Sequence, residues 1–122
     1  MISILVPVYN EEANLLRLID EIREVMSKIG QPYEMMFIDD GSTDGTFAYL
    51  HQLSKGCAEI KLIRFRKNFG KSAALQCGFR KCLGDIVITM DGDLQDNPAD
   101  IPALLKQIDD YDMVCAWRHD VS

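Results

Sequence analysis

The sequence lacks any apolar stretch long enough to span a membrane, and its apolar start at residues 1–8 is short and contains no basic residue. We therefore expect neither a membrane-spanning helix nor a signal peptide in these 122 residues, and we expect the chain by itself to be soluble. Internal repeats and low-complexity segments are absent as well.

Positive charge is also scarce, because 13 Lys and Arg residues face 19 Asp and Glu residues and the formal charge is −6. This balance argues against a nucleic-acid backbone as a partner. It does not argue against a nucleotide, because a bound metal ion reverses the local sign of the charge. The four cysteines show no metal-type spacing, which predicts reduced thiols in a cytosolic protein rather than a zinc site or disulfides.

The most informative stretch is 87–98, where a short β-branched apolar run ends in a group of acidic residues. Asp91 and Asp93 lie two positions apart just after this predicted strand, and side chains two apart in extended chain point the same way. Two converging carboxylates suit a hard cation such as Mg²⁺ or Mn²⁺. The alternative is an acidic turn that caps the next helix, but Gln95 and Asp96 at a strand end favour the metal site.

Predicted strands and helices alternate along the whole chain, which has the length and the 48% hydrophobic content of one ordinary globular domain. Strands are predicted at 2–8, 33–38, 60–65, 85–90 and 112–116, and helices from an Asn10 cap to about 30, at 46–54, at 72–82 and at 98–108. This alternation predicts an α/β fold, a Rossmann-like and mostly parallel sheet with helices on both faces.

The unusual loops of this predicted fold all follow the carboxyl ends of strands, at 7–11, 39–44, 66–71 and 91–96. Open parallel sheets bind ligands beyond the carboxyl ends of their strands, where the strand order reverses. The convergence of four polar loops at that edge predicts a binding site there.

Four motifs in order resemble family 2 glycosyltransferases of the GT-A fold: VPVYNE at 6–11, DDGSTD at 39–44, NFGK at 68–71 and DGDLQD at 91–96. The run at 91–98 is most similar to the polyprenyl-phosphate branch, which includes dolichol-phosphate mannosyltransferases and bacterial undecaprenyl-phosphate sugar transferases. The resemblance implies that residues 1–122 are the nucleotide-sugar-binding half of a truncated GT-A domain. Members of the family continue with an acceptor-binding half and often with membrane helices.

Carried over to this sequence, the resemblance implies that Pro7, Tyr9 and Glu11 line the base and ribose of a bound nucleotide. It implies that Asp39 bonds to the uracil or guanine ring. The alternative for Tyr9 is packing on the first helix alone, and the alternative for Asp39 is a role as a turn-forming residue.

The same resemblance implies that Gly70 and Lys71 approach the base and the phosphates, although Lys71 could equally be a solvated charge at a helix start. It implies that Asp91, Asp93 and Gln95 hold the metal ion and, through it, the diphosphate. Asp91 therefore counts among both the nucleotide-binding and the metal-binding residues, and Asp93 is a catalytic candidate.

Arg118 resembles an arginine that meets the acceptor phosphate in the polyprenyl-phosphate branch, and it is the second catalytic candidate. The sequence departs from that pattern near Val121, where a second arginine is expected and absent. Arg118 can therefore also be read as a surface residue.

The reaction implied is a metal-dependent, inverting transfer of a sugar from a UDP- or GDP-linked sugar to a polyprenyl phosphate. A phosphate monoester is already largely ionised at neutral pH, with a second pKa of about 6, so no general base is needed. The resemblance also implies that the reaction takes place at the cytoplasmic side of the cell membrane. It further implies that parts beyond residue 122 associate with the membrane. Self-association of these 122 residues is a further expectation, because an apolar surface meant for the missing half would be exposed.

Three alternatives remain open at this point. The acceptor could be a saccharide hydroxyl, which would require a carboxylate base. The chain could be a receiver-type signalling module that binds Mg²⁺ through acidic residues at strand ends. It could also bind a sugar nucleotide without catalysing transfer.

Overall fold

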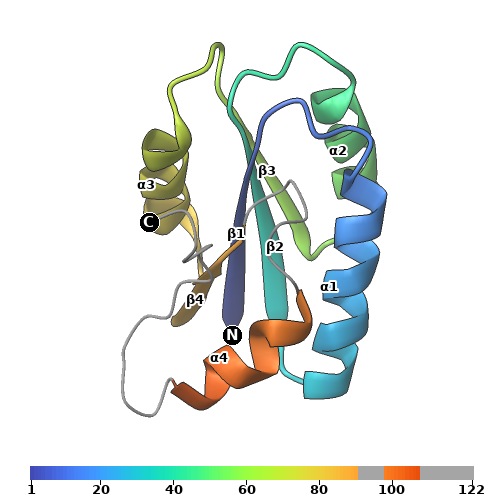
Figure 1. The fold of residues 1–122 in the computed structure, drawn as a ribbon, viewed down its shortest axis with the longest axis vertical. Coiled ribbons are helices and arrows are strands. Elements are labelled where there is room, and N and C mark those ends of the chain that lie inside the picture. Colours follow the sequence, from blue (N-terminus) through green and yellow to red (C-terminus); the bar gives the residue numbers. More distant parts are fainter. Residues whose placement is uncertain (91–97, 108–122) are drawn as a thin grey trace.

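The computed structural model describes residues 1–90 and 98–107. Its elements in order are β1 (Ile2–Val8), α1 (Leu15–Ile29), β2 (Tyr33–Asp39), α2 (Thr46–Gly56), β3 (Ile60–Arg64), α3 (Lys71–Lys81), β4 (Ile86–Thr89), the 3₁₀ turn η1 (Pro98–Asp100) and α4 (Ile101–Gln107). All strand pairs are parallel, and the four strands form one sheet in the order β3-β2-β1-β4 (Figure 1). The predicted α/β fold is confirmed, and the predicted strand at 112–116 lies outside the described residues.

β1 is buried along its whole length, as its continuous apolar sequence predicts for a strand covered on both faces. Ile2, Ile4, Val6 and Val8 belong to the core cluster that includes the buried side chains of α1. Leu5 points the other way and belongs to the cluster that includes α3. The alternation of side chains along β1 therefore builds two separate cores, one on each face of the sheet.

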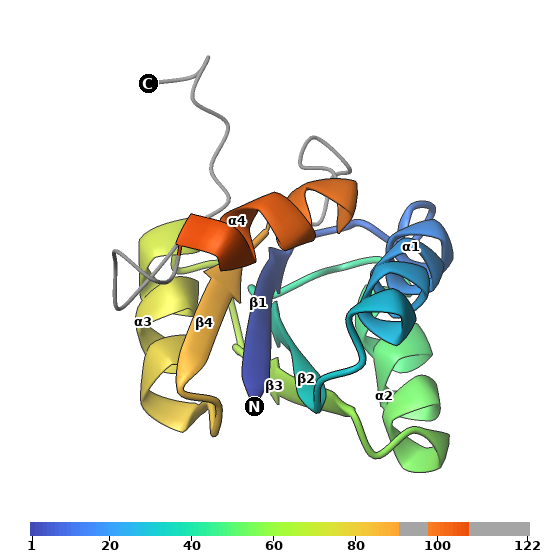
Figure 2. The ribbon, with the colours of Figure 1, turned by 90° about the horizontal axis from the view of Figure 1, so that it is seen from below.

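Helices cover both faces of the sheet, with α1, α2 and α4 on one side and α3 on the other (Figure 2). The apolar face of α1 consists of five buried residues at helical spacing, Leu15, Leu18, Ile19, Ile22 and Met26. Gly78 lets α3 approach the sheet closely, because a Cβ there would lie 3.1 Å from side-chain carbons of Leu5 and Ile38. The close packing of α3 on the sheet therefore requires a residue without a side chain at this position.

The start of α1 differs from the prediction. The helix begins at Leu15 with Asn14 in the cap position, so Asn10 is not the cap. Asn10 instead has a φ of 53°, a left-handed conformation that asparagine adopts more readily than most residues. The end of the helix agrees with the prediction, because Gly30 closes it with a φ of 75°.

The strand order reverses between β1 and β4, which are neighbours in the sheet but far apart in sequence. Pairing of β1 with β4 ends at Leu5 and Thr89, followed by one further hydrogen bond from the Met90 N–H to the Leu5 carbonyl at 2.9 Å. Pro7, which has no N–H to donate, lies beyond that point, while pairing with β2 continues to Val8. The two strands therefore part at their carboxyl ends, where the predicted site lies.

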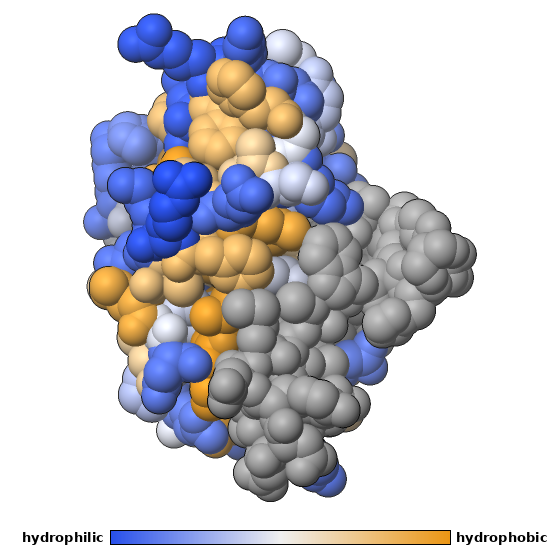
Figure 3. Space-filling view, turned by 90° about the vertical axis from the view of Figure 1, so that its left-hand side faces the viewer, coloured by the Kyte–Doolittle hydropathy of each residue, from blue (hydrophilic) through white to orange (hydrophobic). Residues whose placement is uncertain are grey.

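Two large apolar side chains are exposed at opposite ends of α3, namely Phe69 just before the helix and Leu83 just after it. Apolar and hydrophilic side chains are interspersed on this side of the molecule (Figure 3). Among the helices of residues 1–90 and 98–107, none is both long and apolar enough to cross a membrane.

Candidate functional site

The carboxyl ends of β1, β2 and β3 lie side by side, and the last carbonyls of β1 and β2 each accept an N–H from the residue that follows the neighbouring strand. The Asp40 N–H donates to the Val8 carbonyl at 2.9 Å, and the Phe65 N–H donates to the Asp39 carbonyl at 2.8 Å. The loops that carry Tyr9, Asp39 and Gly70 therefore start from one edge of the sheet, as the sequence predicts.

Asp39 is completely buried at the end of β2. Its Oδ1 accepts the backbone N–H of Ser42 at 2.9 Å, whereas its Oδ2 has no hydrogen-bond partner in the described part of the chain. A buried polar atom without a partner costs about 1–3 kcal/mol, so such atoms are few in folded proteins. The Asp39 Oδ2 atom is therefore suited to accept a hydrogen bond from a ligand.

Asn10 joins the loop after β1 to the loop after β2. Its Oδ1 accepts the N–H of Thr43 at 2.8 Å and that of Asp44 at 3.3 Å, and its own N–H donates to Ser42 Oγ at 2.9 Å. Sequence reasoning assigned Asn10 to a helix cap and missed this role. The signal that could have found it is the tendency of asparagine to bond with backbone groups in turns.

The two glutamates after Asn10 also contact the cap residue of α1 and the start of α2. Glu11 donates its N–H to Thr46 Oγ1 at 3.0 Å, and its Oε2 accepts from Asn14 Nδ2 at 3.1 Å. Glu12 Oε1 accepts the N–H of Gly45 at 3.0 Å. Glu11 and Glu12 therefore join the loop after β1 to the start of α2, and Glu12 is not among the predicted site residues.

Asp44 caps the start of α2 from just outside the helix. Its Oδ1 accepts the Thr46 N–H at 2.9 Å and the Thr46 hydroxyl at 2.6 Å. Desolvation raises the pKa of this carboxyl, but its hydrogen bonds, those from Thr46 first among them, together hold the pKa below its usual value. Aspartate is among the residues that cap helix starts well.

The remaining residues predicted to bind the nucleotide lie at the same edge of the sheet. Pro7 is buried in β1, and Tyr9 just after it is 43% exposed. Gly70 precedes α3 with a φ of 100°, and Lys71 is the exposed first residue of that helix. These positions agree with a site at the carboxyl edge, and the contacts of these residues with a nucleotide stay a prediction.

Asp40 is a further residue at this edge that the sequence analysis did not identify. It is 5% exposed, and its two carboxylate oxygens accept the N–H groups of Phe69 at 2.7 Å and Gly70 at 3.0 Å. The neighbouring Gly41 has a φ of 80°, and a Cβ there would lie 2.6 Å from the backbone nitrogen of Asn68. The loop after β2 therefore supports the loop after β3.

The predicted metal ligands Asp91, Asp93 and Gln95, and the predicted acceptor residue Arg118, lie outside the described residues. Within residues 1–90 and 98–107, no group of three or more His, Cys, Asp or Glu side chains is arranged to hold a metal ion. The metal site stays a prediction.

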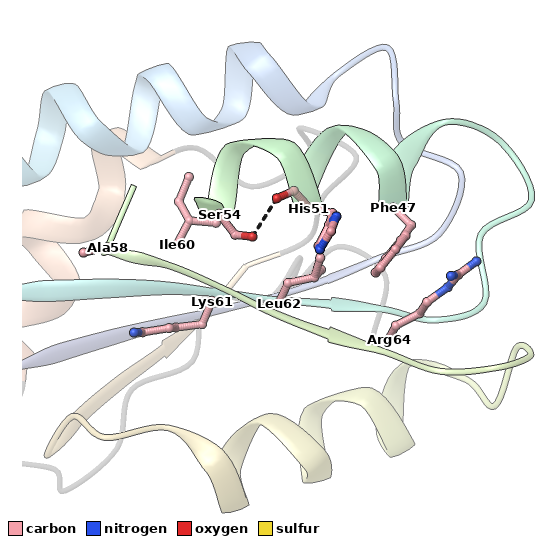
Figure 4. A pocket seen from close by; sticks show the side chains of 8 residues that line it. All are labelled: Phe47, His51, Ser54, Ala58, Ile60, Lys61, Leu62 and Arg64. Atoms are coloured by element: carbon pink, nitrogen blue, oxygen red, sulfur yellow. Dashed lines mark hydrogen bonds between the residues drawn. The ribbon is translucent and has the colours of Figure 1, made fainter. Parts of the chain in front are cut away.

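A separate pocket of about 520 Å³ opens between α2 and the edge strand β3 (Figure 4). The Arg64 guanidinium carbon lies 4.0 Å from the centroid of the Phe47 ring, and that ring stacks on His51 with 5.5 Å between centroids. None of the predicted site residues in the described part of the chain lines it. It is therefore distinct from the edge where β1 and β4 part.

Comparison with known proteins identifies relatives of the whole chain. The family model for glycosyl transferase family 2 matches residues 3–122. A dodecaprenyl-phosphate galacturonate synthase of Rhizobium johnstonii is 32% identical over 120 residues, which are 96% of this chain and 36% of that protein. An undecaprenyl-phosphate 4-deoxy-4-formamido-L-arabinose transferase of Pseudomonas paraeruginosa is 38% identical over 121 residues, 97% of this chain and 35% of that protein. The chain spans about a third of the length of these relatives.

Solved structures of sugar-transferring enzymes superpose on the chain. The mannosyltransferase PcManGT of Pyrobaculum calidifontis, in complex with GDP-Man and Mn²⁺, superposes with a TM-score of 0.72 at 27% identity, over 88% of this chain and 32% of that one. The glucosyl-3-phosphoglycerate synthase of Mycobacterium tuberculosis, in complex with Mn²⁺, UDP and phosphoglyceric acid, gives a TM-score of 0.69 at 28% identity, over 88% and 38%. By sequence and by structure, the chain belongs to glycosyltransferase family 2 and has the α/β architecture of its GT-A fold.

Proposed function

We propose that this protein takes part in a metal-dependent, inverting transfer of a sugar from a UDP- or GDP-linked sugar to a polyprenyl phosphate. The observation that carries the proposal is the buried Asp39 Oδ2, an acceptor without a partner among the described residues, at the ligand-binding edge of a family 2 fold. The named relatives act on dodecaprenyl or undecaprenyl phosphate, which supports the acceptor class. Membership of this family excludes the alternative that the chain is a receiver-type signalling module.

Nucleotide binding is assigned to residues at the carboxyl edge of the sheet. Uracil and guanine both present ring N–H donors, and Asp39 Oδ2 is a buried acceptor that suits either. We assign Pro7, Tyr9 and Glu11 to the walls around the base and ribose, with Glu11 held by its bond to Asn14. GDP-Man and UDP in the solved relatives support a nucleotide diphosphate at this edge, without deciding between the two bases.

The phosphates and the metal ion are assigned to the loops after β3 and β4. Gly70 and Lys71 stand at the start of α3, where a cationic side chain suits a diphosphate. Asp91, Asp93 and Gln95 offer only oxygen donors, which fit Mg²⁺ or Mn²⁺, and Mn²⁺ is present in both solved relatives. A bound cation would neutralise charge on the departing nucleoside diphosphate. The residue just before this acidic segment is Met90, whose N–H donates a hydrogen bond to the Leu5 carbonyl in β1.

The acceptor is assigned to a lipid phosphate, and Arg118 is the residue proposed to bind it. Guanidinium groups match phosphate oxygens in geometry and charge. The attacking phosphate oxygen is already ionised at neutral pH, so the residues need only bind and orient it. Attack from the face opposite the nucleotide inverts the anomeric carbon. We further propose that the reaction takes place at the cytoplasmic side of the cell membrane, and that these 122 residues are the nucleotide-binding half of the enzyme.

The test is a transfer assay on membranes from cells that produce the protein, supplied with radiolabelled UDP- or GDP-sugars. We expect label in a chloroform-soluble lipid, and we expect membranes carrying Asp93→Asn to yield far less of it. Label that reaches polysaccharide or protein without a chloroform-soluble intermediate would contradict the lipid acceptor. That result would favour a saccharide hydroxyl as the acceptor.

A further inference from the structure

Two buried carboxylates lie on the side of β2 that faces α3, one at each end of the helix. Glu34, at the amino end of β2, is 3% exposed, and its Oε2 accepts the N–H of Leu83 at 2.7 Å and the hydroxyl of Ser3 at 2.6 Å. Asp40, just beyond the carboxyl end of β2, accepts the N–H groups of Phe69 and Gly70. Leu83 follows α3 and Gly70 precedes it, so one strand holds both ends of the helix.

The bonds of Asp40 fix the backbone at the start of α3. Each of its oxygens takes one of two consecutive backbone N–H groups, and hydrogen bonds to a charged group are about twice as strong as neutral ones. The carboxylate also sits at the positive end of the helix dipole. Gly70 is thereby held at a φ of 100°, which sets the direction in which the chain enters Lys71.

The same bonds limit what the start of α3 can offer to a nucleotide. A helix N-terminus binds phosphate through its exposed backbone N–H groups. Here the N–H groups of Phe69 and Gly70 are already bonded to Asp40, so they do not serve a phosphate. The exposed cationic side chain of Lys71 lies at this same helix start and suits a phosphate.

We propose that Asp40 is a positioning residue for the nucleotide site, and that it acts by holding Gly70 and Lys71 in the conformation that meets the diphosphate. The inference rests on the proposed function, which assigns these two residues to the nucleotide. Glu34 makes the same kind of bond at the far end of the same helix, away from the carboxyl edge. It therefore serves as a matched control outside the predicted nucleotide site.

The test compares Asp40→Asn with Glu34→Gln, and measures both the urea midpoint and the affinity for UDP and GDP in the presence of Mn²⁺. Asparagine keeps one acceptor oxygen but places an NH₂ group against the second backbone N–H. We expect both variants to lose stability, because each loses a charged acceptor of backbone N–H groups. We expect only Asp40→Asn to lose nucleotide affinity, by about tenfold or more, since small displacements of a binding group carry large penalties. Glu34→Gln should bind within about twofold of wild type.

Hydrogen exchange gives a second readout that does not use the ligand. Asp40→Asn should speed amide exchange at Phe69 and Gly70, and Glu34→Gln should speed it at Leu83 instead.

Should Asp40→Asn fail to fold, Asp40→Glu takes its place, because it keeps the charge and displaces the carboxylate by one methylene. A folded Asp40 variant that binds like wild type would overturn the inference, as would equal losses of affinity in the Asp40 and Glu34 variants. If wild type itself binds no nucleotide, the proposed function fails before any variant is compared, and this inference fails with it.

Discussion

Asp39 accepts the backbone N–H of Ser42 through Oδ1 at 2.9 Å, and its other carboxylate oxygen is buried with no partner in residues 1–90 and 98–107. The first bond fixes the side chain, so the second oxygen has a fixed direction. A fixed and desolvated acceptor is what a binding site needs in order to select a ring N–H, because an analogue without the donor would leave it unpaired.

Replacing Asp39 with alanine should weaken nucleotide binding and leave the fold intact. The change removes an unpartnered buried oxygen along with the bond to Ser42, so the two effects on stability oppose each other. The lost ligand bond, at roughly 1.5–3 kcal/mol for a charged acceptor, corresponds to roughly 10- to 150-fold in affinity. Calorimetry and circular dichroism measure the two effects, with Asp20→Ala on the exposed side of α1 as control. If the variant is partly unfolded but its remaining folded fraction binds the nucleotide with unchanged affinity, then Asp39 is only a turn-forming residue.

Substituting alanine for Gly41 should destabilise the chain more than the same change at Gly30. Both residues have a left-handed φ, 80° and 75°, so both variants carry the backbone penalty of about 1–2 kcal/mol. Only at Gly41 does the new Cβ meet backbone, at Lys67 and Asn68, and such overpacking adds about 1–3 kcal/mol. Urea denaturation of the two variants isolates the contact between the loops. Equal free energies of unfolding would mean that the loops do not approach each other closely.

Acid should reduce stability partly through Asp44. The folded-state pKa of this carboxyl lies below its usual value of 3.8, so its contribution to stability is present above that pH and is lost as the pH falls through the lower folded pKa. Asp44→Asn should therefore show a smaller fall in the urea midpoint between pH 5 and pH 3 than wild type. Asp20→Asn, on the exposed side of α1, is the control. If the Asp44→Asn variant loses as much stability as wild type over this range, Asp44 does not contribute to the loss of stability in acid.

Asp93→Asn should reduce sugar transfer far more than sugar-nucleotide binding. The change removes one charged oxygen from the proposed metal ligands, and charge on the leaving diphosphate is greatest in the transition state. Loss of an electrostatic stabiliser of this kind lowers the rate by roughly 10²- to 10³-fold. The transfer rate in membranes and the affinity for the nucleotide sugar provide the two values. A parallel fall of both would indicate that Asp93 serves binding alone.

The sequence predicts the sheet well because its strands are buried and apolar. β1 and β2 carry near-continuous apolar runs, and the predicted bounds differ from the structure by at most one residue. The start of α1 was wrong by several residues, because Asn10 can serve as a helix cap or as a left-handed loop residue with the same side chain. Local sequence does not distinguish these roles, since the choice depends on Ser42 and Thr43, about 30 positions away.

The candidate site is predicted only in part for the same reason. The sequence places Asp39 and Gly70 at one edge of the sheet, because parallel strands bring their carboxyl ends together. It does not indicate that Asp40 supports the loop before α3, because that bond links residues 29 and 30 positions apart. Glu12 was missed likewise, since its contact with Gly45 requires two loops to meet. Motifs identify the ligand-binding edge, and the structure adds the residues that shape it.

We propose that this chain binds a nucleotide diphosphate with the help of a divalent cation. Isothermal titration calorimetry of the wild-type chain with UDP and GDP, with Mn²⁺ present and again with excess chelator, tests it most directly. We predict weak binding of one of the two nucleotides with Mn²⁺ or Mg²⁺, and a clear loss of that binding when the chelator is added. Equal binding in both conditions would remove the metal ion from the account, and an absence of binding in both would contradict the nucleotide site itself.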